Sequence, residues 1–178
     1  IYLGQEIATL ADHQRGIEAV AFSPDGRYFA SASKDTNAFI YNLTTTAPFR
    51  NPIRLSEHQN GIWDLAFSPD GQYLVTAGIL AQIFLWNLTT PEFTVTPLSG
   101  ATDDLINVEV SANSRWVAAT GSNRFIYLWD VEEGETDTPV TLSDHSRPLN
   151  DIKFSPDDRF LAVSYTHLRA HETPLHRV

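Results

Sequence analysis

The sequence contains neither cysteine nor methionine in its 178 residues. The absence of cysteine excludes disulfide bonds, thiolate nucleophiles and thiolate metal ligands. No apolar run reaches the roughly 20 residues that a transmembrane helix needs, and no signal peptide is recognisable. Because the chain begins at Ile1 and has no methionine, we expect its natural N-terminus to lie upstream. With no targeting segment in view, we expect a cytoplasmic protein.

Basic residues are also scarce. The chain has 12 Lys and Arg against 22 Asp and Glu, which gives a formal net charge of −10. So acidic a chain is repelled by the phosphates of nucleic acids and by anionic membrane surfaces. We therefore expect protein partners, and neither nucleic acid nor a membrane. Hydrophobic residues make up 42% of the chain, which is enough for a domain with a real core and excludes a disordered composition.

The sequence repeats itself four times. "FSPDG" occurs twice, and "VSANS" and "FSPDD" are its variants; these motifs begin at Phe22, Phe67, Val110 and Phe154. A period of about 44 residues indicates stacked supersecondary units. In each unit, a short apolar run, the turn motif, a second run such as "RYFASAS", and a third such as "AFIYNL" follow in order, and a more polar segment closes the unit. Alternating residues and frequent turn signals predict strands, with no helical periodicity.

The first strand of each unit carries an extra residue. Ile17, Val20 and Phe22 are spaced three and then two apart, although residues on one face of a strand should be two apart. A β-bulge restores the alternation and re-aims the side chain at the extra position. The bulge positions of the four units are Glu18, Trp63, Ile106 and Asn150. Together with Lys34 from a neighbouring turn, we expect these residues to form a partner-binding face on one rim.

These features together resemble the WD-repeat (WD40-type) β-propeller family. The signals are the "FSPDG" turns, the strand ends "LWN" and "LWD", and histidines placed nine residues before three turns: His13, His58 and His145. The resemblance covers residues 1–164 and implies an all-β fold, a partial β-propeller of four-stranded antiparallel blades. The implied repeats span about 5–45, 50–90, 93–133 and 138–164, three of them complete, with partial repeats at both ends.

The resemblance also implies a buried network of His, Ser or Thr, Asp and Trp in each blade. Carried over by position, its members are His13, Ser31, Asp35, Tyr41, His58, Thr76, Trp86, Asn123, Trp129 and His145. The pattern is degenerate, because Tyr41 stands for Trp and Leu80 for Asp, and the third unit has Ala101 and Ala119 in place of His and Ser. A missing partner leaves a buried polar group unpaired, so we expect the blades to differ in stability.

Two groups of histidines carry a catalytic or metal-binding alternative. The pairs Asp12-His13, Glu57-His58 and Asp144-His145 resemble acid–base dyads, but one dyad in every unit is typical of a structural role and not of an active site. His167 and His171 have a spacing that binds metals on helices, although no helix is predicted there. We therefore expect no catalytic residues, no metal and no cofactor.

The resemblance implies a non-enzymatic scaffold for protein–protein interactions, as a fragment of a larger propeller. A repeat array presents its loops and bulges on one face, where partners bind. An alternative is a regulatory or sensor module of a larger signalling enzyme, such as a bacterial kinase or signalling ATPase. A propeller enzyme of a different family is a third reading, against which the "LWD" strand end and the repeated histidines argue.

Both ends of the chain depart from the repeat. Residues 4–13 read as the fourth strand of an upstream blade. At the other end the fourth unit loses its pattern after Ser164, and "VSYTHLRAHET", residues 163–173, resembles the translation of a sequencing-library adapter. We therefore expect residues 165–178 to be a non-native, disordered tail whose three histidines have no biological role.

Overall fold

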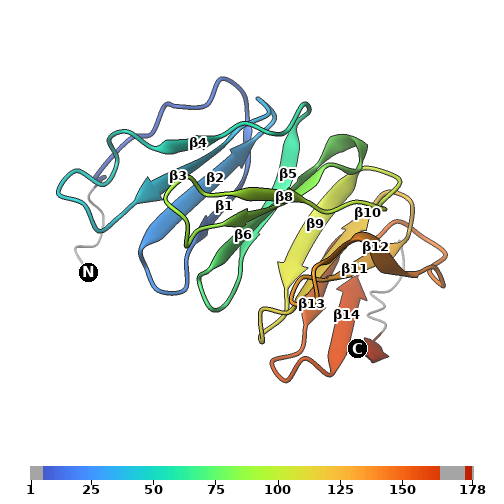
Figure 1. Ribbon diagram of the computed structural model, residues 1–178. Helices are drawn as coiled ribbons and strands as arrows, with labels where there is room; N and C mark the ends of the chain where they lie inside the picture. Colours follow the sequence, from blue (N-terminus) through green and yellow to red (C-terminus); the bar gives the residue numbers. More distant parts are fainter. Residues whose placement is uncertain (1–5, 165–174, 178) are drawn as a thin grey trace.

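The computed structural model describes residues 6–164 and 175–177, and in them four antiparallel sheets stand side by side (Figure 1). In each sheet the strands are hydrogen-bonded in the order of the chain. The first sheet contains β1 (Ile17–Phe22), β2 (Tyr28–Ser33), β3 (Ala38–Asn42) and β4 (Ile53–Leu55). The second contains β5 (Ile62–Phe67), β6 (Tyr73–Gly78), β7 (Ile83–Asn87) and β8 (Val95–Pro97).

The third sheet contains β9 (Leu105–Val110), β10 (Trp116–Gly121), β11 (Ile126–Asp130) and β12 (Glu135–Leu142). The fourth has three strands in the described residues, β13 (Asp151–Phe154), β14 (Phe160–Ser164) and β15 (Leu175–Arg177). The first strands of successive sheets, β1, β5, β9 and β13, adjoin one another. The result is the predicted all-β, partial propeller, with blades fanning out from these inner strands (Figure 1).

A hydrophobic core lies between each pair of successive blades. Leu65 and Trp86 belong to the first core, Val108 and Trp129 to the second, and Ile152 to the third. The third strands of the second and third blades are apolar on both faces because each face meets a core. The outer face of β1 lacks such cover: Val20 and Phe22 are 59% and 67% exposed, whereas Leu65 of the next blade is 5% exposed.

The "FSPDG" motif forms the turn between the first two strands of each blade. In the first blade Ser23 Oγ donates to Asp25 Oδ1 (2.6 Å) and accepts the Tyr28 N–H (2.8 Å). The last turn residue has a positive φ in every blade, and it is Gly26, Gly71, Ser114 or Asp158. Glycine adopts this conformation freely, whereas the serine and the aspartate hold it against a steric cost.

The two non-glycine turn residues connect neighbouring blades. Ser114 Oγ accepts the Asp70 N–H across the second junction (3.2 Å). Across the third junction, the carboxylate of Asp158 accepts the N–H groups of Ala112 and Asn113, both at 2.7 Å. These bonds offset the backbone strain that glycine would have avoided.

The predicted bulges are present in the three complete blades. The pairing of β1 with β2 shifts between Ile17 and Ala19, and that of β5 with β6 between Ile62 and Asp64. The pairing of β9 with β10 shifts at the equivalent place. The extra residues are therefore Glu18, Trp63 and Ile106. In the fourth blade Asn150 stands just before β13, and its N–H donates to Ser164 O (2.8 Å).

Two expectations about the ends need correction. The segment from Glu6 to Gly16 forms no strand, because no described strand lies beside it to accept and donate ladder hydrogen bonds. The predicted disorder of the tail is wrong for Leu175–Arg177, which pair with β14 as a third strand. Residues 165–174 and 178, and with them most of the adapter-like segment, lie outside the described residues, so the adapter interpretation stays a prediction. Within the described residues, no helix is long and apolar enough to cross a membrane.

Candidate functional site

Three of the residues predicted for the partner-binding face lie in contact. The ammonium group of Lys34, in the turn between β2 and β3, is 2.8 Å from the carboxylate of Glu18 and 4.8 Å from the ring centre of Trp63. Glu18 and Trp63 occupy the bulges of adjacent blades, so the lysine bridges the first junction. A cation held over a half-buried indole is an attractive contact that also keeps the ring in one place.

A polar cleft of about 430 Å³ opens beside Lys34. Arg15 and Thr36 line it from the first blade, and Asn60, Gly61 and Ile79 line it from the second. Gly61 leaves room for this close approach, since a Cβ at this position would lie 3.2 Å from Lys34 Cα, a tight contact. Within the described residues, Arg15 makes no ion pair with a carboxylate. The rim near Lys34 therefore offers a free cation in an otherwise acidic chain.

The other two residues of the predicted face occupy matching positions farther along the fan. Ile106 is the bulge residue of β9 and is 36% exposed. Asn150 holds the equivalent place before β13 and is also exposed. The repeat places Ile106 one blade and Asn150 two blades away from Trp63. Both therefore lie farther along the rim than the contact between Lys34 and Trp63.

Asp64, next to the bulge residue Trp63, forms hydrogen bonds that support the rim. Its carboxylate accepts the N–H of Leu65 in its own strand and the N–H of Val108 in the next blade, both at 2.9 Å. Burial raises the pKa of Asp64, although these two N–H donors partly oppose the shift. The residue thus connects the second and third blades directly beneath the candidate face.

The polar network of the first blade is nearly complete. His13 Nε2 lies 2.8 Å from Ser31 Oγ, and its Nδ1 lies 3.0 Å from Asp35 Oδ2. Burial alone would raise the pKa of Asp35, but the N–H groups of Gln14 and Asn37 and the His13 ring lower it overall. Tyr41, expected in the position of the family's Trp, instead donates its hydroxyl to Asp12 Oδ2 (2.7 Å). This bond occupies the carboxylate of the Asp12-His13 pair.

The second blade has half of the network. His58 Nε2 lies 2.8 Å from Thr76 Oγ1, which also accepts the indole N–H of Trp86 (2.9 Å). Leu80, within the 3-10 turn η1 (Ile79–Ala81), offers no acceptor, so the buried Nδ1 of His58 has no hydrogen-bond partner. Burial lowers the pKa of His58 to about 4. The ring is therefore neutral near pH 7.

In the second blade, another side chain makes some of the hydrogen bonds that the missing aspartate would make to the loop backbone. In the first blade, Asp35 Oδ2 accepts the Gln14 N–H. In the second, Gln82 Oε1 accepts the N–H groups of Gln59 and Asn60, at 3.0 and 3.2 Å. The loop backbone is satisfied in both blades, but only the carboxylate of the first blade also reaches the histidine.

The third blade has an alternative network that the family pattern did not reveal. The hydroxyl of Tyr127 lies 2.6 Å from Asn123 Nδ2 and 2.9 Å from Thr102 Oγ1. The same position is Phe39 in the first blade and Phe84 in the second, and each of those rings packs edge-on against the histidine. The available signal was a tyrosine that replaces phenylalanine in the one unit that lacks both His and Ser.

Trp129 and His145 complete the predicted set. Because Ala119 has no hydroxyl, the indole N–H of the fully buried Trp129 donates to the carbonyl of Ser99 (2.7 Å). In the fourth blade His145 is buried, its Nε2 has no hydrogen-bond partner among the described residues, and its ring lies 4.9 Å from that of His176. Burial is the main cause that lowers the pKa of His145.

The histidines of the tail were a further candidate metal site in the sequence. His167 and His171 lie outside the described residues. Among the residues that are described, no group of three or more His, Asp or Glu side chains is arranged to hold a metal ion.

The repeats match a known family model, the WD domain or G-beta repeat, in four stretches: residues 4–42, 50–87, 92–130 and 137–171. One curated relative is similar over a short stretch. Actin-interacting protein 1 of Drosophila melanogaster is 47% identical over 38 residues, which are 21% of this chain and only 6% of that protein. The four family matches cover most of the chain, and each contains the first two strands of one blade. The chain therefore belongs to the WD40 repeat family.

Proposed function

We propose that this chain is a non-enzymatic scaffold for protein–protein interactions, and that partners bind the rim formed by Glu18, Lys34, Trp63, Ile106 and Asn150. The WD40 repeats support an interaction role, because members of this family generally act as interaction modules. The curated relative is named for an interaction with another protein, but the matched 38 residues are about one repeat. That match supports the class of function and does not identify a partner.

The observation that carries the proposal is the contact of Lys34 with Trp63 across the first junction. Tryptophan residues are enriched among the side chains that contribute most to binding at protein interfaces. Trp63 is half-buried and held in place by a neighbouring cation, so little conformational freedom remains to be lost on binding. The adjoining cleft with Arg15 adds a polar pocket in which a partner's carboxylate would be paired.

The test is affinity capture with the full 178-residue chain, read by quantitative mass spectrometry. A partner captured by the natural chain should be lost from Lys34→Glu and from Trp63→Ala. The matched control is Arg50→Glu, the same charge reversal at an exposed residue of the β3–β4 connection, at the other end of the blade. Circular dichroism would confirm that all variants are folded. A partner that binds all four proteins equally would show that this rim is not the binding face.

A further inference from the structure

At the end of the blades where the turn joins the first two strands, the four units differ in the two residues that follow the turn. In three blades the arginine after the turn lies over the aromatic ring of the next residue, with guanidinium carbon to ring centre distances of 5.1, 5.4 and 5.8 Å: Arg27 and Tyr28, Arg115 and Trp116, and Arg159 and Phe160. In the second blade the pair is Gln72 and Tyr73. The Gln72 amide donates to Asp70 Oδ2 (3.0 Å) instead. In the part of the chain that the structure describes, no cation therefore lies over the Tyr73 ring.

Tyr73 also lacks the cover that its counterpart receives from the next blade. Tyr28 packs edge-on against Phe93 of the β7–β8 connection, with ring centres 5.8 Å apart, and is 6% exposed. At the second junction, the β11–β12 connection is shorter and brings Val131 and Glu132 to the equivalent place. A cleft of about 230 Å³ remains there, with half-buried Tyr73 in its wall.

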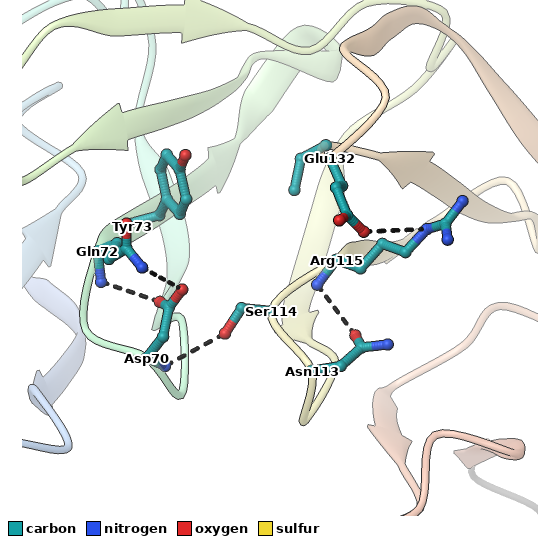
Figure 2. A pocket seen from close by; sticks show the side chains of 8 residues that line it. Asp70, Gln72, Tyr73, Asn113, Ser114, Arg115 and Glu132 are labelled. Carbon is teal, nitrogen blue, oxygen red and sulfur yellow. Dashed lines mark hydrogen bonds and ion pairs between the residues drawn. The ribbon is translucent and has the colours of Figure 1, made fainter.

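The charged groups of this cleft are mostly carboxylates. Figure 2 shows Asp70, Gln72 and Tyr73 on one side, and Arg115 and Glu132 on the other. The guanidinium of Arg115 is already engaged, because its Nε and Nη2 both donate to Asp130 and its Nη2 also donates to Glu133 (2.9 Å). This pairing lowers the pKa of Asp130. Glu132 is held less closely, with its Oε2 3.8 Å from Arg115 Nε (Figure 2). Asp70 accepts hydrogen bonds from Ser68 and Gln72 of its own turn but forms no ion pair within the described residues. These two carboxylates line the opening.

We propose that this cleft between the second and third blades binds an arginine side chain of a protein partner, with its guanidinium over the Tyr73 ring and between the carboxylates of Asp70 and Glu132. The three other blades provide the pattern, since each places its own guanidinium on the corresponding ring. A planar guanidinium can stack on an aromatic face and pair with carboxylates at once. The volume is below the roughly 300–1,000 Å³ of small-molecule pockets, which suits one side chain.

The bound group is expected to be part of a polypeptide and not free arginine. The α-ammonium and α-carboxylate of free arginine add no net charge for the two carboxylates of the cleft to attract, whereas the flanking backbone of a peptide offers further hydrogen-bonding groups beside the side chain. This site is separate from the rim of the proposed function. The inner strands begin at the bulge and end at the turn, so the rim and the cleft lie at opposite ends of the blades.

The experiment titrates the full chain with the blocked pentapeptide Gly-Gly-Arg-Gly-Gly and follows the Tyr73 ring protons by NMR. Two probes serve as controls: the same peptide with citrulline, which keeps the shape without the charge, and free L-arginine. We expect the arginine peptide to shift the Tyr73 signals saturably, and the two controls to bind at least about tenfold more weakly.

Two variants decide whether the cleft is responsible. Gln72→Arg gives the second blade the cation that the others have, and we expect it to abolish peptide binding without loss of folding. Glu132→Gln should weaken binding several-fold. The proposal is overturned if the citrulline peptide binds as well as the arginine peptide, if Gln72→Arg binds unchanged, or if no saturable shift of Tyr73 occurs. Lys34→Glu on the rim should leave this binding intact, which separates the two proposals.

Discussion

In the first blade the ring of His13 joins Ser31 to Asp35, whereas in the third blade the hydroxyl of Tyr127 joins Thr102 to Asn123. In the third blade a single tyrosine supplies both the aromatic ring and the polar atom. In the first blade two residues share these roles: Phe39 supplies the ring, and a nitrogen of His13 is the polar atom. The lost serine is not replaced, and the indole of Trp129 turns to a backbone carbonyl.

The comparison shows that different residues can pair the buried polar groups at this depth. Buried donors and acceptors without partners cost more than a made hydrogen bond contributes. The second blade is the informative intermediate case. It keeps the histidine but has lost the aspartate, and one ring nitrogen of His58 stays unpaired.

The largest effect is expected at the buried tryptophan of the third blade. Trp129 is fully buried and packs against Tyr127 with ring centres 5.9 Å apart. We expect Trp129→Ala to lower the free energy of unfolding by about 3–5 kcal/mol, because it removes a large apolar volume and leaves a cavity. Urea denaturation followed by circular dichroism measures this. Trp116→Ala, at a half-buried residue of the same blade, is the control and should cost clearly less.

The next effect is a pH dependence that comes from the histidine of the second blade. The pKa of His58 lies near 4 in the folded state because of burial, below the ordinary value of 6.5. Between these values the unfolded chain binds a proton that the folded chain does not, so stability falls as the pH drops from 6.5 to 4. The loss should approach about 3 kcal/mol at the lower end.

Unfolding at a series of pH values, compared with His58→Gln, isolates this contribution. Asp64 acts in the opposite direction, because its raised pKa makes the folded state bind a proton more readily. The difference between the two proteins cancels that background. An unchanged slope in His58→Gln would show that His58 does not cause the acid sensitivity.

A smaller effect tests the substitute network directly. Tyr127→Phe should cost about 1–3 kcal/mol, because it leaves the Asn123 amide and the Thr102 hydroxyl without this partner. The control is Tyr73→Phe, since no hydrogen bond from the Tyr73 hydroxyl to described residues is found. Adding Ala101→His and Ala119→Ser to Tyr127→Phe should recover part of the loss by rebuilding the network of the first blade. If Tyr127→Phe and Tyr73→Phe lowered the free energy of unfolding equally, Tyr127 would not be replacing the histidine network of the first blade.

The smallest expected effect repairs the second blade. Leu80 is 69% exposed and has a φ of +58°, a conformation that aspartate tolerates better than leucine. Leu80→Asp puts a carboxylate at the sequence position that Asp35 holds in the first blade, and we expect a gain of about 0.5–1.5 kcal/mol. An NMR titration should show the pKa of His58 rising. Leu80→Ala, which offers no acceptor, should leave that pKa in place.

The sequence by itself determined the features that depend on neighbouring residues. The period near 44 residues, the serine-centred turns and the bulges at Glu18, Trp63 and Ile106 all follow from patterns a few residues long. Such patterns act through local backbone conformation and the alternation of strand faces, which need no knowledge of distant partners. The same local logic failed for residues 6–13, because a strand also needs a neighbour.

Only the tertiary structure decided which side chains meet. The bond from Tyr41 to Asp12 joins residues 29 positions apart, and that from Tyr127 to Thr102 joins residues 25 apart. The position of Lys34 over Trp63 and the opening at Tyr73 likewise depend on how one blade stacks on the next. A repeat pattern assigns equivalent positions, but the partner at each position depends on substitutions in a neighbouring strand or blade. Those pairings exist only once the blades have packed, because burial is what makes an unpaired group costly.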